Sequence, residues 1–229
     1  MDGNLIRQPI KGASKILCVA RNFTHVEKER NEALSDRMRK AAIFLKPPSS
    51  LATISPHVSL NGFTDIVCET EITLLMGRYI PRRANGCSKD EATGAVAGFT
   101  IGFDFTRKDL QNGLKAAGKP WELSKGFDGA CPLGGFIPMD KAEGLMDGSK
   151  PVSVNLIHND KITLSQSTKD MILSPIELIQ LLSQHFSINA GDVIMTGTPM
   201  LPEQPPRLKA GDTLMASVGT VMEIRTTVV

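Results

Sequence analysis

Two glutamates, Glu69 and Glu71, stand two residues apart in the apolar segment 65–76. This segment has the composition of a β-strand, so both side chains leave the same face, with Cα atoms about 6–7 Å apart. Paired carboxylates on an apolar strand repel each other and lose hydration, and a divalent cation relieves both costs. The alternative, which spacing alone favours, is a solvated strand edge where both glutamates pair with Lys or Arg.

A third carboxylate, Asp104, ends the apolar run 97–103, and the ends of such runs line clefts. Three carboxylates suit Mg²⁺ or Mn²⁺ better than Zn²⁺, which prefers His and Cys. Lys125 lies between Trp121 and a glycine-rich turn, where its ammonium could neutralise a carboxylate or an enolate. Taken alone, such a lysine is more often a surface charge.

The run TGTP at 196–199 follows a predicted strand and offers hydroxyls and backbone N–H groups to an anionic oxygen, although it could also be a simple turn. His25 begins a polar segment, 24–42, that lacks Gly and Pro and is predicted to be one helix. Glu29 then lies on the same helical face, and a carboxylate beside an imidazole raises its basicity for activating water. The alternative is an exposed pair without a function.

The remaining patterns predict the elements that position these residues. Strands are predicted at 15–20, 43–45, 65–76, 97–105, 192–196, 213–218 and 220–228, with a hairpin of 152–157 and 161–164 around an Asn159-Asp160 turn. Helices are predicted at 24–42, at 107–117, and after two capping boxes that begin at Ser88 and Ser174. Strands and helices do not alternate as βαβ units, so the predicted class is α+β, mostly β.

Composition excludes several classes of protein. Of 229 residues, 41% are hydrophobic and 22% charged, as in ordinary globular proteins, and the net charge of +2 gives no electrostatic case for nucleic acid or a membrane surface. No apolar stretch approaches the ~20 residues that span a bilayer. The four cysteines form no C-x-x-C pair, and the first residues have neither a signal-peptide core nor many arginines. We therefore expect a cytoplasmic protein, with a mitochondrial location left open.

Six motifs occur in a characteristic order: RNFTHVEKE, IFLKPPSS, CETEITLLMG, GFDFTRKDLQ, KPWELSKGFDGACPLG and NAGDVIMTGTP. From about Lys15 to about Val221 the chain resembles the fumarylacetoacetate hydrolase family, in particular its small acylpyruvate hydrolase and oxaloacetate decarboxylase members. The resemblance implies a mixed β-sandwich roll with a few short helices, one catalytic domain at 15–229 after an extension at 1–14, and usually a homodimer.

The resemblance also implies roles for individual residues. Mg²⁺ or Mn²⁺ would be bound by Glu69, Glu71 and Asp104. Lys125 would be catalytic, and a His-Glu dyad that handles water would begin at His25, with Glu29 as its partner. Substrate would be bound by Gln111, Thr198 and Lys108.

Four positions depart from the pattern of the family. Cys68 replaces a histidine before the first metal glutamate, Lys28 stands where the dyad glutamate usually lies, and Lys108 aligns with an arginine, while Arg107 is one place off. After TGTP, the run MLPEQPPR replaces the usual glycine-rich sequence.

The expected reaction is metal-dependent cleavage of a C–C bond in a 2-oxo acid through an enolate, as an acylpyruvate hydrolase or an oxaloacetate decarboxylase. A keto–enol tautomerase of oxaloacetate uses the same enolate and is the first alternative. A non-catalytic protein that binds a metal or a metabolite is the second. The expected partner is a small 2-oxo acid, with no nucleic acid and no membrane.

Overall fold

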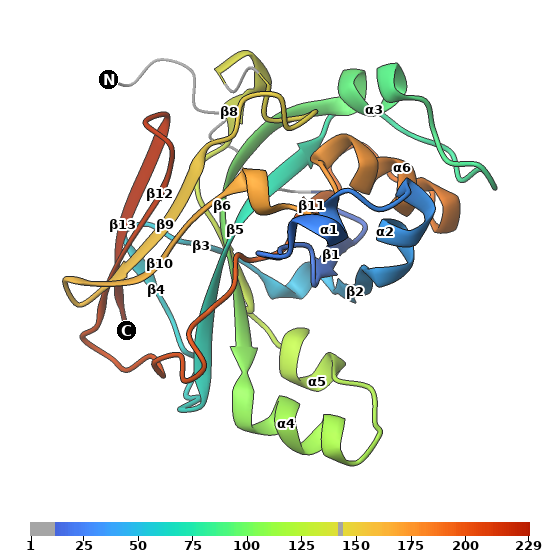
Figure 1. The fold of residues 1–229 in the computed structure, drawn as a ribbon. Coiled ribbons are helices and arrows are strands. Elements are labelled where there is room, and N and C mark those ends of the chain that lie inside the picture. The colour runs from blue at the N-terminus through green and yellow to red at the C-terminus, as the bar shows by residue number, and fades with distance from the viewer. Residues whose placement is uncertain (1–11, 142–143) are drawn as a thin grey trace.

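The computed structural model describes residues 12–141 and 144–229, whose strands form two sheets (Figure 1). The larger sheet runs in the order β2 (Ala42–Lys46), β1 (Ile16–Ala20), β11 (Val193–Met195), β5 (Ile66–Met76), β6 (Val96–Arg107), β7 (Cys131–Leu133) and β3 (Leu51–Thr53), and β8 (Ile137–Pro138) pairs with β6. The smaller sheet runs in the order β10 (Lys161–Ser167), β9 (Ser153–His158), β12 (Thr213–Val218), β13 (Met222–Val228) and β4 (His57–Val58).

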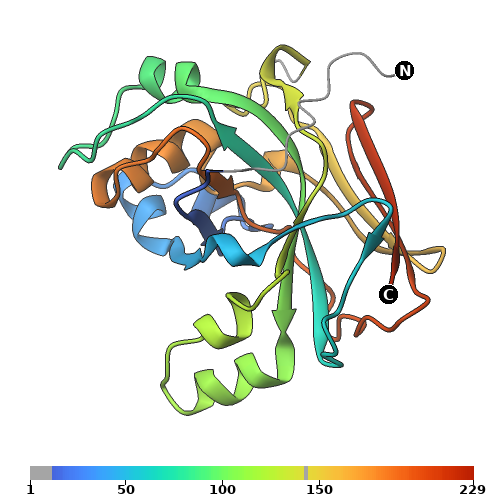
Figure 2. The same cartoon turned by 180° about the vertical axis from the view of Figure 1, so that it is seen from behind.

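The long antiparallel pair β5 and β6 runs through the middle of the molecule. The smaller sheet lies on one side of this pair, and helices α1 (Glu27–Arg30), α2 (Leu34–Lys40) and α6 (Pro175–His185) lie on the other (Figures 1 and 2). Both strands are therefore buried on their two faces, and Phe99, Ile101, Phe103 and Phe105 of β6 have no exposed surface. Burying each such side chain stabilises the fold by about 1.5–3 kcal/mol.

Helices α3 (Lys89–Ala95) and α4 (Lys108–Ala116) lie at the two ends of β6. The other helices are α5 (Glu122–Lys125) and the 3₁₀ turns η1 (Pro48–Ser50), η2 (Met139–Lys141) and η3 (Thr168–Asp170). In the described part of the chain, no helix is long and apolar enough to cross a membrane.

Most predicted elements are confirmed, including the predominance of strands. Both capping boxes are formed, at the N-termini of α3 and α6. The predicted hairpin turns at Asn159 and Asp160, whose φ angles of 49° and 63° are typical of a two-residue turn between strands.

The prediction of one helix over 24–42 is wrong. The structure has two short helices, α1 and α2, neither of which buries a residue, and His25 precedes both. With so few apolar positions the segment cannot bury a stripe along a long helix. Polar contacts hold it instead: Arg37 binds Glu177 of α6 with nitrogen–oxygen distances of 2.6 and 3.0 Å. Of the predicted N-terminal extension 1–14, residues 1–11 lie outside the described part.

Candidate active site

The register of β5 and β6 brings the three carboxylates to one place. Glu69 lies directly opposite Asp104, and Glu71 lies opposite Gly102, so all three acids leave the same face of the pair. A Cβ on Gly102 would lie 2.3 Å from Thr73 Oγ1 and 2.9 Å from the Leu133 side chain, so this close packing requires a glycine. Asp104 and Glu71 are almost fully buried, at 1% and 3% exposure. Of the pair for which a solvated strand edge was the alternative, Glu71 is buried and does not fit it, whereas Glu69 is half-buried and pairs with a lysine.

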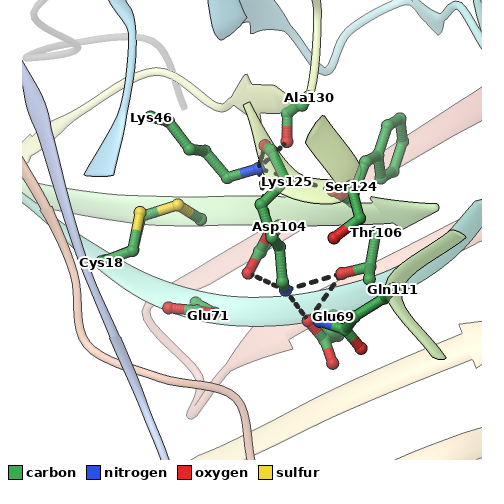
Figure 3. Close-up of polar contacts among 12 residues, drawn as sticks. Cys18, Lys46, Glu69, Glu71, Asp104, Thr106, Gln111, Ser124, Lys125 and Ala130 are labelled. Atoms are coloured by element: carbon green, nitrogen blue, oxygen red, sulfur yellow. Dashed lines mark hydrogen bonds and ion pairs between the residues drawn. The ribbon is translucent and has the colours of Figure 1, made fainter. Parts of the chain in front are cut away.

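Lys125 lies between two of these carboxylates (Figure 3). Its Nζ is 2.5 Å from Glu69 Oε2, 2.5 Å from Asp104 Oδ2 and 2.6 Å from Thr106 Oγ1, and Thr106 also donates to Glu69 Oε2 at 2.9 Å. Burial alone would lower the pKa of Lys125, but the two carboxylates outweigh it and raise the pKa above its ordinary value. The lysine is therefore a buried ammonium at the centre of the cluster.

The second cation of the cluster is Lys46, a residue that sequence reasoning missed. Its Nζ lies 2.8 Å from Asp104 Oδ1 and donates to the backbone carbonyls of Lys125 and, at 2.9 Å, Ala130. A fully buried ammonium requires such partners, and the signal was available, because Lys46 ends the apolar strand β2. Burial works to raise the pKa of Asp104, yet Lys125 and Lys46 together hold it below its ordinary value.

Glu71 has no lysine as a partner within the described residues. Its Oε2 accepts a hydrogen bond from the Gly197 N–H at 2.7 Å. Burial, followed by the negative charge of Asp104, raises the pKa of Glu71 well above its ordinary value, and the Gly197 N–H offsets this only in part. Of the three carboxylates, Glu71 is therefore the one whose ionised form an added positive charge would stabilise most.

The TGTP run forms a loop against the segment after β1. Gly197 has a φ of 97°, and a Cβ there would lie 2.8 Å from the Val19 carbonyl oxygen. The buried Asn22 side chain donates to the carbonyl of Thr196 at 2.9 Å, which ties the two segments together. Thr198 Oγ1 is buried without a hydrogen-bond partner in the described structure, so this hydroxyl is available to a ligand.

A pocket of about 380 Å³ opens over the cluster. It brings together three of the predicted site residues, Glu69, Lys108 and Thr198, and adds Arg21, which sequence analysis did not single out. Its other lining residues are Phe23, Pro199, Met200, Leu201, Pro202, Glu203 and Pro205. The pocket is therefore walled by the loop after β1, the TGTP loop and the start of α4.

Two predicted substrate-binding residues stand together on α4. Gln111 is buried, at 3% exposure, and its Oε1 lies 3.3 Å from Lys108 Nζ. Arg107, the neighbouring candidate, turns elsewhere: its Nε lies 3.2 Å from Asp65 Oδ1 and its guanidinium stacks 4.2 Å above the Phe63 ring. The cation available to the pocket from this segment is therefore Lys108.

The predicted dyad of His25 and Glu29 is not brought together as a helical pair. The exposed His25 ring has Asp170 as its ionic neighbour, with Nδ1 4.0 Å from Oδ2. The Glu29 carboxylate accepts from Thr24 Oγ1 at 2.6 Å and lies 3.5 Å from Lys40 Nζ. Because His25 lies outside α1, the helical spacing that would join it to Glu29 does not apply.

The oxygen donors of the cluster suit a divalent cation, although in this structure the three carboxylates are not close enough together to bind one. In the described residues no three His, Cys, Asp or Glu side chains are grouped closely enough to hold a metal as they stand, since Lys125 lies between Glu69 and Asp104. The donors are nonetheless the hard oxygens that Mg²⁺ and Mn²⁺ prefer. A cation would also relieve the cost of ionising the buried Glu71.

Comparison with known proteins finds a matching family model and relatives that are about one-third identical to this chain. A family model described as fumarylacetoacetate (FAA) hydrolase C-terminal matches residues 15–229. An oxaloacetate tautomerase of Escherichia coli is 32% identical over 198 residues, which are 86% of this chain and 84% of the relative. A mitochondrial oxaloacetate decarboxylase of Dictyostelium discoideum is 34% identical over 188 residues, 81% of each chain.

Solved structures share the fold. A protein of Oleispira antarctica, 32% identical, superposes with a TM-score of 0.79 over 95% of this chain and 94% of its own. A fumarylpyruvate hydrolase of Pseudomonas aeruginosa, solved with Mn²⁺ and pyruvate, has a TM-score of 0.77 over 95% of this chain and 90% of its own. At 23% identity, the second likeness shows the fold alone.

Proposed function

The chain belongs to the fumarylacetoacetate hydrolase family, and from that premise we propose that it is an enzyme that interconverts the keto and enol forms of oxaloacetate. One observation carries this proposal: Lys125 and the carboxylates, which suit an enolate, are assembled at the pocket, whereas His25 and Glu29, which would activate water together, each contact a different partner. Tautomerisation moves one proton between C3 and the 2-oxygen and needs no attacking water. Relatives about one-third identical to this chain carry the name oxaloacetate tautomerase.

Oxaloacetate decarboxylation is the second candidate, because it passes through the same enolate and a relative 34% identical carries that name. Hydrolysis of an acylpyruvate, the other C–C cleavage predicted from the sequence, requires water activation in addition. It stays a prediction that the same assay tests.

We propose Mg²⁺ or Mn²⁺ as the cofactor, held by Glu69, Glu71 and Asp104. When bound, the cation supplies Lewis-acid stabilisation of the negative charge on the enolate. The proposal is supported by the oxygen donors and by the raised pKa of Glu71, which an added cation would lower. A protein of the same fold has been solved with Mn²⁺ and pyruvate.

The chain's own residues have separate roles in this proposal. The Lys125 ammonium holds a proton and a positive charge beside the place where the enolate oxygen forms, a position worth roughly 3–4 kcal/mol in sites of this kind. Thr198 Oγ1, which has no partner in the described structure, donates to a substrate oxygen. Lys108, supported by Gln111, attracts the substrate carboxylate to the pocket.

The test follows the ultraviolet absorbance of the enol of oxaloacetate, and separately of acetylpyruvate, with Mn²⁺ and with excess chelator. We expect metal-dependent acceleration of enol–keto exchange of oxaloacetate without matching formation of pyruvate. Pyruvate formed from oxaloacetate at the rate of enol loss would establish the decarboxylase instead. Pyruvate and acetate from acetylpyruvate would establish the hydrolase, and no metal-dependent change with either substrate would contradict an enzyme of this class.

We further propose that the chain acts as a homodimer, as the family resemblance implies, and that it lies in the cytoplasm, with a mitochondrial location as the alternative. Light scattering of the purified protein measures the first part. Fractionation of the native cell measures the second.

A further inference from the structure

Arg21 is an exposed arginine at the pocket with no ionic partner. Among the described residues its guanidinium makes no hydrogen bond and no ion pair, although it lines the same pocket as Glu69, Lys108 and Thr198. Two other arginines near this end of the molecule are engaged: Arg107 binds Asp65, and Arg207 binds Asp109 at 2.6 Å. A free guanidinium beside a pocket is therefore a distinguishing feature of Arg21.

The backbone holds Arg21 in a costly conformation. Its φ is 60°, in the left-handed region that non-glycine residues occupy at a cost of about 1–2 kcal/mol. Such a conformation persists only where neighbouring contacts enforce it, and these positions cluster at ligand sites.

Asn22 supplies the enforcing contacts. Its side chain donates to the carbonyls of Leu173 and Thr196 at 3.0 and 2.9 Å and accepts from the Leu173 N–H at 2.8 Å. Its backbone carbonyl accepts from the Ile172 N–H at 2.8 Å. Because β1 ends at Ala20 and Asn22 is clamped, the Arg21 backbone is fixed between them, beside the loop that carries Thr198.

We propose that Arg21 forms an anion subsite that receives the distal carboxylate of a four-carbon 2-oxo dicarboxylic acid, and so selects dianionic over monoanionic substrates. The proposal rests on the proposed function, which places the 2-oxo acid end of the substrate at the carboxylate cluster. The other pocket cation, Lys108, is joined to the buried Gln111 and lies nearer the start of α4. A guanidinium matches a carboxylate with two parallel hydrogen bonds, which the neutral far end of a monoanionic substrate cannot accept in the same way.

One pocket residue offers a competing explanation. Glu203 also lines the pocket, and a carboxylate there could pair with Arg21 and close the entrance. In that case the arginine would act on access to the pocket and would not distinguish one substrate from another. The variants Arg21→Gln and Glu203→Gln separate the two explanations.

The test uses two unreactive ligands that differ only at the far end: malate, with a distal carboxylate, and lactate, with a hydrogen atom in its place. Binding of each is measured by calorimetry with Mn²⁺ present, for the wild type and for the Arg21→Gln, Arg21→Lys and Glu203→Gln variants. We expect the wild type to bind malate at least 10-fold more tightly than lactate, Arg21→Gln to lose this preference, and Arg21→Lys to retain part of it. Glu203→Gln should keep the preference.

The proposal is overturned if the wild type shows no preference for malate, if malate does not bind, if Arg21→Gln weakens both ligands equally, or if Glu203→Gln abolishes the preference as well. Binding is measured without turnover, so its outcome is independent of the activity assay. A malate preference that depends on Arg21 in a protein that does not tautomerise oxaloacetate would keep the subsite and reject the proposed reaction.

Discussion

The exchange of Lys125 for methionine tests the account of the cluster most directly. Lys125→Met keeps the unbranched chain of the lysine except for its last atom, the ammonium that contacts Glu69 and Asp104 at 2.5 Å each. The lysine side chain is 4% exposed and that of Asp104 is 2% exposed, so the carboxylates left behind lie in a buried environment. Removing one partner of such a buried ion pair costs about 3–5 kcal/mol.

For a chain of this length, each kcal/mol lowers the melting temperature by about 2–4 °C. In a chelator we therefore expect Lys125→Met to melt roughly 6–20 °C below the wild type. Mn²⁺ should then raise the melting temperature of the variant more than that of the wild type, because the two carboxylates gain a cation where they had lost one. Differential scanning calorimetry with and without Mn²⁺ measures both shifts.

Lys15→Met is the matched control. Lys15 Nζ lies 2.6 Å from Asp192, whose side chain has no exposed surface, so this exchange also removes the cation from a buried aspartate. The pair lies outside the carboxylate cluster, and Mn²⁺ should stabilise this variant no more than the wild type. The reasoning is refuted if Mn²⁺ gives Lys125→Met no extra stabilisation, or gives Lys15→Met the same extra amount.

Three further exchanges have defined outcomes. Glu71→Ala should abolish Mn²⁺ binding measured by calorimetry, and unchanged affinity would reject Glu71 as a ligand. If the protein hydrolyses acetylpyruvate, His25→Ala should lower hydrolysis about 10²-fold or more and tautomerisation less, as expected for a group that activates water; equal losses would argue against that role. Burial works to raise the pKa of Asp192, but hydrogen bonds from Lys15, Asn189 and Ser14 hold it below its ordinary value. Its contribution to stability is therefore complete above about pH 4 and lost as pH falls through the lower folded pKa. Asp192→Asn should flatten this acid limb in melting curves, and an unchanged limb would contradict the assignment.

The predictions from sequence succeeded where a pattern is local. The Ser174 capping box and the turn at Asn159 and Asp160 each depend on a few adjacent residues, and both are present as predicted. The carboxylate cluster followed from the two-residue spacing of Glu69 and Glu71 on a strand, together with the family resemblance. The opposite placement of Asp104 depends on strand register, which adjacent residues do not specify.

The predictions failed where distant segments decide the structure. Segment 24–42 has good helix formers throughout, but its contacts with α6 and η3 divide it into two helices. Lys46 reaches Asp104 from a strand 58 residues away in sequence, and β2 is not a neighbour of β6 in the sheet. Its burial depends on Asp104 and on the backbone carbonyls of Lys125 and Ala130, so no local pattern predicts it. Strands β4 and β8 are two residues long and carry too little pattern to be recognised.

The site divides into a floor and walls with different physical constraints. The floor is set by β5 and β6, where Glu69 and Asp104 occupy one register position and share Lys125, while Lys46 binds Asp104. Removal of Lys125 would therefore leave two carboxylates short of a buried partner. The walls carry Arg21 on the loop after β1, Lys108 at the start of α4 and Thr198 on the TGTP loop. Substitutions at these positions should lower the stability of the fold less than substitutions in the floor. Enolate chemistry should therefore be the invariant property of this architecture, and the choice of 2-oxo acid should be decided by the wall residues. Transfer of substrate preference between proteins of this fold should accordingly require substitutions in these walls, while the three carboxylates and two lysines of the floor stay as they are.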